Sequence, residues 1–171
     1  MKHTISVLVE NKFGVLARVA GLFSARGFNI DSLAVGETED PTVSRMTIIS
    51  KGDDKTLEQI KKQLNKLIDV IKVVDFKEGE FVDRELMLIK AAVNAKNRNA
   101  VLEAVESVGG RVVSALSNSI SVEVAGDSNK INGLIELLRP FGIVEMVRTG
   151  RIALGTGEKG MKAEGKPEVN E

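Results

Sequence analysis

The strongest constraint on the fold is an order of strand-like and helix-like segments that occurs twice along the chain. Between residues 5 and 74, segments with an apolar residue at every second position alternate with segments whose apolar residues recur about every 3.6 positions. The first spacing is typical of strands and the second of helices. The pattern predicts the order β-α-β-β-α-β, which is typical of a four-stranded antiparallel sheet covered on one face by two helices. The first helix has an apolar stripe that we expect to be buried, formed by Leu16, Val19, Ala20 and Phe23.

The same order recurs between residues 86 and 147. We therefore predict an α+β protein of two tandem ferredoxin-like (βαββαβ) domains, in which the open sheet faces and the loops at their rims remain for ligands or partners. The expected divisions are 1–76 for the first domain, 77–83 for a polar linker, 84–154 for the second domain and 155–171 for a tail. We expect the tail to be disordered because it is rich in glycine and charge.

The composition removes several classes of function. The chain of 171 residues has no Cys, which excludes thiolate metal sites and cysteine nucleophiles. Its one His is His3, two residues from the start, which argues against a histidine-based catalytic triad and a multi-histidine metal site. The 24 Lys and Arg residues balance the 24 Asp and Glu residues, and Trp and Tyr are absent, which argues against a nucleic-acid partner. No apolar run approaches the roughly 18 residues of a membrane span. We expect a cytoplasmic protein with no metal site and no membrane contact.

The loop between the first strand and the first helix is the best candidate for a ligand site. Gly14 allows the backbone to approach a bound group, and the amides of Val15 and Leu16 at the helix start favour an anion such as a carboxylate. Asn11 adds amide donors and an acceptor, enough to hold both ends of a zwitterion. The alternative is that Asn11 and Gly14 only cap the helix and shape the turn, and spacing alone favours this structural role.

Asn29 lies where the second strand begins, and in this fold the second strand is at the edge of the sheet. A polar residue there either prevents unwanted pairing of the edge or contacts a second chain. In the second case two chains pair along this edge and enclose a small ligand between residues 11–16 of one chain and Asn29 of the other. Both interpretations are open at this point.

Several blocks within residues 2–76 resemble a known family. They are Asn11-x-x-Gly14-x-Leu16, Gly27-Phe28-Asn29-Ile30, Ser44-Arg45-Met46-Thr47 and Gln59-Ile60-x-x-Gln63-Leu64. In this order they resemble the regulatory (small) subunit of acetolactate synthase, also called acetohydroxyacid synthase. Over residues 84–154 the likeness rests mainly on the strand–helix order and on Glu85-Leu86-Met87-Leu88-Ile89-Lys90.

The resemblance implies an N-terminal ACT domain, which is a regulatory module that binds amino acids, in a chain without catalytic residues. Such subunits associate with a large catalytic subunit that uses thiamine diphosphate, magnesium and FAD, so no cofactor is expected in this chain. They raise the activity of the large subunit and confer feedback inhibition in branched-chain amino acid synthesis, usually by valine.

The resemblance also implies a homodimer in which two ACT domains pair side by side with the effector at their interface. The effector-binding residues that it carries over are Asn11, Gly14, Val15 and Leu16, with Asn29 across the dimer. A further contact position, often Ala in the family, is Gly36 here.

Three other functions are compatible with this fold class. An acylphosphatase-like hydrolase would need an Arg in the first strand–helix loop, which offers only Lys12. An RNA-recognition module would need aromatic residues on the central strands, and these strands contain none. A free-standing ACT amino-acid sensor with a different partner fits the residues best of the three.

Overall fold

The computed structural model describes residues 2–158 and 160–162, and the chain divides into two compact units. The first unit comprises Met1–Val82 and Arg151–Glu171, and the second comprises Asp83–Gly150. Each unit has its own sheet and its own hydrophobic core.

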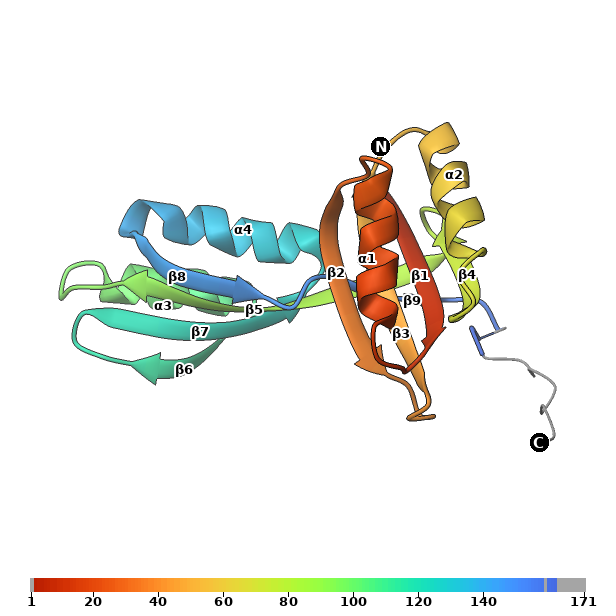
Figure 1. Cartoon of the computed structure of the whole chain (residues 1–171). Coiled ribbons are helices and arrows are strands. Elements are labelled where there is room, and N and C mark those ends of the chain that lie inside the picture. The colour runs from red at the N-terminus through yellow and green to blue at the C-terminus, as the bar shows by residue number, and fades with distance from the viewer. Residues whose placement is uncertain (1, 159, 163–171) are drawn as a thin grey trace. The chain divides into compact units, whose positions relative to one another are not determined.

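The first unit has the predicted order of elements. Its strands and helices are β1 (Lys2–Glu10), α1 (Val15–Ala25), β2 (Ile30–Glu37), β3 (Val43–Lys51), α2 (Asp54–Leu64) and β4 (Val70–Phe76). The antiparallel sheet has the order β2-β3-β1-β4, so β2 lies at the edge as predicted. Helices α1 and α2 lie on the same face of this sheet (Figure 1).

The buried stripe of α1 differs from the prediction. Its buried residues are Val15, Val19, Leu22 and Phe23. The side chain of Leu16 is 46% exposed, so its assignment to the core was wrong. The reason is local: the chain enters α1 through Gly14, which has a φ of 81°, and the helix begins at Val15. This start turns Val15 toward the sheet and Leu16 away from it.

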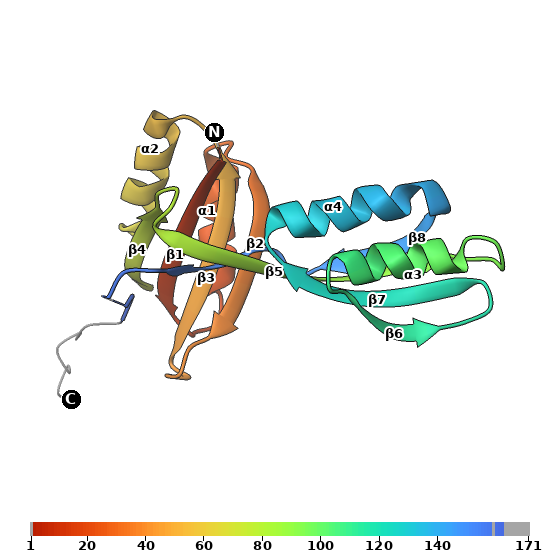
Figure 2. The same cartoon turned by 180° about the vertical axis from the view of Figure 1, so that it is seen from behind.

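The second unit repeats the predicted plan and confirms the α+β class with two ferredoxin-like units. Its elements are β5 (Phe81–Ala92), α3 (Arg98–Ser107), β6 (Arg111–Ala115), β7 (Ser119–Gly126), α4 (Ser128–Leu138), a short 3-10 helix η1 (Arg139–Phe141) and β8 (Ile143–Arg148). The sheet order is β6-β7-β5-β8. Helices α3 and α4 share one core with its strands (Figure 2).

The stretch expected to be a linker, residues 77–83, forms a tight turn followed by the start of a strand. The backbone N–H of Glu80 donates to the carbonyl of Lys77 at 3.1 Å, and Gly79 has a φ of 84°. Strand β5 begins at Phe81, whose ring stacks on Phe76 with 5.2 Å between the centroids. Residues 77–83 were expected to be a polar linker, but the stacked rings of Phe76 and Phe81 and the hydrogen bond between Glu80 and Lys77 make them a structured turn.

The end of the chain also departs from the expected division. Strand β9 (Ile152–Gly155) pairs with β5 and belongs to the first unit, whereas the sequence assigned residues up to 154 to the second domain. Gly155, expected in the disordered tail, is the last residue of this strand. Residues 159 and 163–171 of that expected tail lie outside the described residues.

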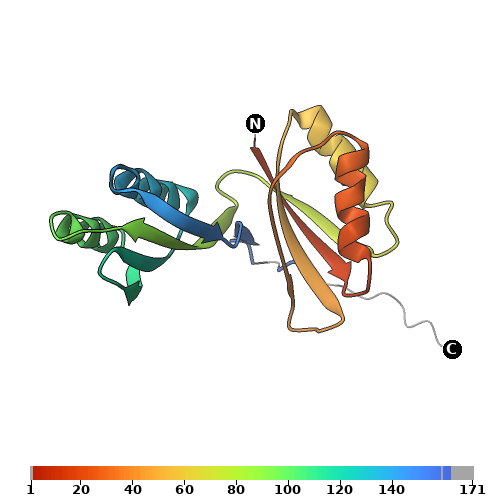
Figure 3. The same ribbon diagram turned by 60° about the vertical axis from the view of Figure 1, so that its left-hand side comes forward.

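Strand β9 lies on the face of the first sheet opposite α1 and α2 (Figure 3). Ser6, Thr47 and Ala153 on this side are all at most 6% exposed. The expectation of an open face for ligands was therefore wrong for the first sheet, because a distant segment of the same chain covers it.

Candidate functional site

Five of the six predicted site residues lie at one end of the first sheet. Asn11 follows the end of β1, residues 14–16 lead into α1, and Gly36 is the penultimate residue of β2. Because β1 runs toward this end and α1 starts from it, the loop between them lies beside the last residues of β2.

Asn11 fastens this loop to the connection between β2 and β3. Its Nδ2 donates to Glu37 Oε1 at 3.0 Å and to the carbonyl of Pro41 at 2.9 Å, while its backbone N–H donates to the carbonyl of Thr42 at 2.7 Å. Both side-chain donors of Asn11 are therefore used within the chain, and only its Oδ1 remains to accept from a ligand. This narrows the predicted role of Asn11 to the ammonium end of a zwitterion.

Glu37 is a site residue that the sequence analysis missed. Its carboxylate accepts from the Asn11 amide and adds a negative group that could bind an ammonium ion. No short-range pattern signals this role, because it depends on β2 returning alongside the loop after α1.

The start of α1 is not capped by any side chain of the described residues, and no acidic residue lies in its first turn. The N–H of Val15 reaches the carbonyl of Lys12 only at 3.4 Å. By contrast, Asp53 caps α2 by accepting from the N–H of Thr56 at 2.8 Å. Free amides and the positive end of the helix dipole make the start of α1 suitable for a carboxylate.

Arg18 adds positive charge beside these amides and was also missed. A Cβ placed on Gly14 would lie 3.2 Å from Arg18 Nη1, so the guanidinium is next to the backbone of the loop. The carboxylate of Asp69 holds it there, with 2.8 Å from Nε and 2.7 Å from Nη2 to Oδ2. The available signal was the spacing of four residues from Gly14, which is one helical turn.

Several apolar side chains of the loop, α1 and β2 are exposed. Leu16 and Val35 are 46% and 45% exposed, and Phe13 in the loop is fully exposed. The side chain of Val15 is buried in the core, so only its backbone amide is available to a ligand. A Cβ on Gly36 would meet no atom within 4 Å, which leaves room beside the strand.

Asn29 lies at the opposite end of β2 from the other five residues. Its Nδ2 donates to Asp31 Oδ1 at 2.7 Å, and its carbonyl accepts from Ser50 Oγ at 2.8 Å. Seven residues of extended chain separate Asn29 from Gly36, which corresponds to about 23 Å. Within one chain the structure therefore does not bring Asn29 to the site.

Two kinds of feature are lacking in the part of the chain that the structure describes. No group of three or more His, Asp or Glu residues is placed to hold a metal ion. No described helix has the length and apolar character needed to cross a membrane.

The fold and this site define a regulatory ACT domain followed by a second ferredoxin-like domain. The family model described as the AHAS small subunit-like ACT domain matches residues 5–72, and the model described as the small subunit of acetolactate synthase matches residues 84–157. The chain belongs to the acetolactate synthase small-subunit family.

Relatives along almost the whole length support this assignment. The chain is 52% identical over 160 residues to a probable acetolactate synthase small subunit of Methanothermobacter thermautotrophicus, covering 93% of this chain and 95% of the relative. It is 51% identical over 159 residues to the acetolactate synthase small subunit of Mycobacterium leprae, with 93% and 94% covered.

A solved structure is similar to this chain over the length of both units. The crystal structure of the acetolactate synthase small subunit from Thermotoga maritima has a TM-score of 0.86 and 38% identity, covering 93% of this chain and 99% of that chain. These findings confirm the resemblance read from the sequence and, with it, a subunit that is not itself catalytic.

Proposed function

We propose that this chain is the regulatory subunit of a cytoplasmic acetolactate synthase. It activates a catalytic large subunit and makes it subject to feedback inhibition by a branched-chain amino acid, with valine as the first candidate. The thiamine diphosphate, magnesium and FAD of the reaction belong to the large subunit. Family membership supports the partnership, since the relatives are named small subunits of this synthase.

The observation that carries the effector proposal is the uncapped start of α1 beside the Asn11–Glu37 pair. The effector carboxylate takes the amide of Leu16 and the neighbouring Arg18 guanidinium, and its ammonium takes Asn11 Oδ1 and Glu37. Hydrogen bonds to charged groups contribute about 1.5–3 kcal/mol each. A zwitterion thus satisfies both poles of a site that is positive at the helix and negative at the strand end.

The side chain of the effector lies on Leu16 and Val35, which are exposed apolar residues at the edge of the unit. One methylene changes binding to such a surface by only about 1–3 kcal/mol. We therefore expect valine, leucine and isoleucine to bind with affinities that differ modestly, and charged amino acids to bind much more weakly.

A homodimer completes the site. Strand β2 has a free edge in the sheet, and the exposed outer surface of α1 beside it is nearly uncharged, with Ala17, Gly21 and Ser24. Antiparallel pairing of two β2 strands about a point between Ser32 and Leu33 would place Asn29 of a second copy opposite Gly36 of the first. This pairing gives Asn29 a role at the site that it does not have within one chain.

Feedback requires that the effector bind two states of the complete enzyme with different affinity, because equal binding shifts no equilibrium. Enzyme assays with the reconstituted large subunit test this directly. We expect saturating valine to lower the activity that the small subunit confers. Recovery of no thiamine-diphosphate enzyme with this chain from its native cell would instead favour a free-standing ACT sensor.

Calorimetry with valine tests the site. We expect Asn11→Ala and Asn29→Ala each to weaken binding at least about tenfold, which corresponds to one lost hydrogen bond to a charged group. Asn129→Ala, at an exposed position of α4, is the matched control and should bind as the original chain does. Undiminished affinity in both site variants would remove the assigned pocket.

Mixing the two variants tests whether Asn29 acts across the dimer. A mixed dimer of Asn11→Ala and Asn29→Ala chains contains one site with both substitutions and one site with neither, so tight binding returns at half of its sites. If both residues acted within one chain, mixing would restore nothing.

A further inference from the structure

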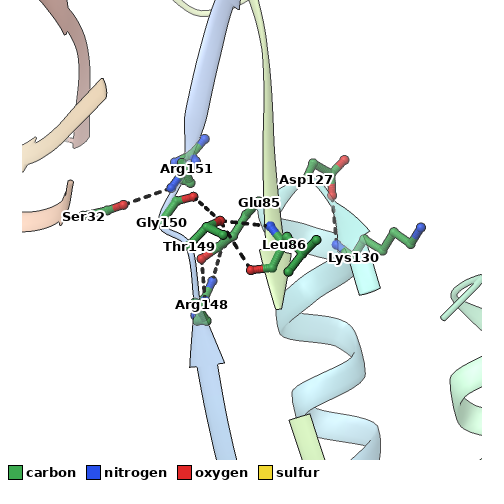
Figure 4. A network of polar contacts seen from close by, with 9 residues as sticks. All are labelled: Ser32, Glu85, Leu86, Asp127, Lys130, Arg148, Thr149, Gly150 and Arg151. Atoms are coloured by element: carbon green, nitrogen blue, oxygen red, sulfur yellow. Dashed lines mark hydrogen bonds and ion pairs between the residues drawn. The ribbon is translucent and has the colours of Figure 1, made fainter. Parts of the chain in front are cut away.

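Side chains of two strands, β2 and β3, bond the backbone of β9 and of Arg151 just before it. Arg45 of β3 donates through Nη2 to the carbonyl of Ala153 at 2.9 Å and through Nε to Ser6 Oγ of β1 at 2.9 Å. Ser32 Oγ of β2 accepts from the backbone N–H of Arg151 at 3.0 Å (Figure 4). The backbone N–H of Ala153 donates to Thr47 Oγ1, with 3.4 Å between nitrogen and oxygen.

Arg45 connects these contacts to the effector site. It is the cross-strand partner of Gly36 in the β2–β3 register. Partners in an antiparallel pair have Cα atoms about 4.5–5.5 Å apart, with side chains on the same face. The Arg45 side chain and β9 lie on the face of the sheet away from α1, so the backbone of Gly36 separates the guanidinium from the proposed effector position on the α1 side.

Burial makes Arg45 sensitive to its partners. Arg45 is partly buried, and desolvation lowers the pKa of its guanidinium, which donates to the carbonyl of Ala153 and the hydroxyl of Ser6. If the Arg45 guanidinium moves, its hydrogen bonds to Ser6 and Ala153 must break or these two groups must move with it.

The chain just before β9 is anchored in the second unit. Arg148, at the end of β8, forms two 2.7 Å hydrogen bonds with the buried carboxylate of Glu85, and the N–H of Thr149 donates to the carbonyl of Leu86 at 3.0 Å (Figure 4). Only Gly150, with a φ of 80°, separates this anchor from Arg151. The segment from Arg148 to β9 is thus held by hydrogen bonds on both sides of Gly150.

We propose that Arg45 is a positioning residue that couples effector binding to the attachment of β9 on the first sheet. The inference rests on the proposed effector site. It adds a route by which binding at that site alters the attachment of β9, the strand that follows the second domain in the chain. Effector binding restrains the end of the β2–β3 pair, and because Arg45 and Ser32 belong to this pair, β9 opens less often when the effector is bound.

Hydrogen exchange of the full-length dimer measures this coupling. The amides of Arg151 and Ala153 are the reporters, since side chains of the first sheet accept from them. We expect saturating valine to slow their exchange at least about fivefold, the lower range of allosteric coupling. The amide of Ala92, bonded to Gly142 in the second unit, is the internal reference. Unchanged or faster exchange at both reporters with valine bound would overturn the coupling.

Arg45→Gln separates coupling from a merely structural role. Because coupling is reciprocal, we expect this variant to lose the valine-induced slowing and to bind valine more weakly by the same factor. If Arg45 were only structural, exchange would be faster but valine would still slow it by the original factor, which would overturn the proposal. Arg45→Lys should restore the slowing only in part, since an ammonium lacks the fork that reaches Ser6 and Ala153 together.

Two further variants complete the test. Ser32→Ala removes the acceptor of the Arg151 amide without removing a charge, and it should reduce the valine-induced slowing of exchange. This variant replaces Arg45→Gln in the test if Arg45→Gln does not fold. Arg111→Gln removes an exposed guanidinium paired with Glu123 in the second unit and should change nothing. If calorimetry detects no binding of valine, leucine or isoleucine, the proposed site itself fails and the coupling fails with it. Binding with unchanged exchange refutes the coupling alone.

Discussion

The two units share one order of elements but treat the loop before their first helix differently. In the second unit, Asn94 accepts from three successive amides: its Oδ1 binds the N–H groups of Lys96 and Asn97 at 2.9 and 3.1 Å, and its carbonyl binds that of Arg98 at 3.1 Å. In the first unit the corresponding asparagine, Asn11, points instead to the β2–β3 connection. The amides before α3 are thus bonded to Asn94, whereas the amides at the start of α1 have no side-chain cap among the described residues and can bind a ligand.

The sheet faces away from the helices differ as well. In the first unit β9 covers this face, and its polar side chains bond the backbone of β9. In the second unit Leu86, Leu88 and Val147 remain exposed on the strands of the sheet. The prediction of an open face therefore holds for one unit only, although both have the same topology.

The largest expected effect on stability comes from Glu85, whose ion pair in the second unit should stabilise the fold without affecting valine binding. Glu85→Ala removes a buried carboxylate that accepts two 2.7 Å hydrogen bonds from the partly exposed guanidinium of Arg148. We expect the free energy of unfolding to fall by about 2–4 kcal/mol in urea titrations, with valine affinity unchanged.

The control is Lys90→Ala, which breaks an exposed pair with Glu145 and should cost less than about 0.5 kcal/mol. A loss of valine affinity in Glu85→Ala would contradict the assignment of the ligand site to the first unit.

Gly14→Ala tests the glycine that shapes the loop before α1. Its φ of 81° is unfavourable for a side chain, and the new methyl group would lie 3.2 Å from Arg18 Nη1. We expect a loss of about 1–2 kcal/mol in stability together with much weaker valine binding in calorimetry.

Gly133→Ala is the matched control, because Gly133 lies within α4 and its Cβ would meet nothing within 4 Å. This substitution should stabilise the chain by up to about 1 kcal/mol and leave valine binding intact. Full valine affinity in Gly14→Ala would show that the loop backbone is not part of the site.

Asn94→Ala is the counterpart of the asparagine substitution in the first unit. It removes a side chain that organises the entry to α3, so we expect a loss of about 1 kcal/mol in thermal unfolding. Valine affinity should remain unchanged. Equal loss of valine binding in Asn94→Ala and Asn11→Ala would erase the distinction between the two loops.

Gly36→Ala is expected to have the smallest effect on stability. Its Cβ meets no atom within 4 Å, and the residue lies in an extended edge strand, so unfolding should change by less than about 0.5 kcal/mol. Because Gly36 adjoins Val35 at the edge of the proposed site, the ratio of valine to leucine affinity should shift by calorimetry. An unchanged ratio would place the effector side chain elsewhere.

Much of the fold was predictable because it depends on periodicity and local backbone chemistry. The alternation of polar and apolar residues gave both βαββαβ orders and the edge position of β2, and Gly27 has the left-handed conformation expected after a helix, with a φ of 68°. Asp53 caps α2 as its position before the helix suggests. These features require no knowledge of contacts between distant residues.

What could not be predicted depends on long-range packing. The return of β9 to the first unit brings Arg45 to Ala153 across 108 residues, and no local pattern indicates it. Similarly, the Asn11 side chain bonds Glu37 across 26 residues, so its remaining role at the site emerges only from the structure. The assignment of an effector-binding role to Asn11, residues 14–16, Asn29 and Gly36 stays a prediction.

The most direct test of the central claim is a titration of the isotope-labelled full-length chain with valine, followed by the backbone amide resonances. The account predicts saturable shifts at residues 14–16, at the start of α1, with the amides of residues 96–98 before α3 unchanged. Shifts of equal size at both loops, or shifts at neither despite measured binding, would contradict it.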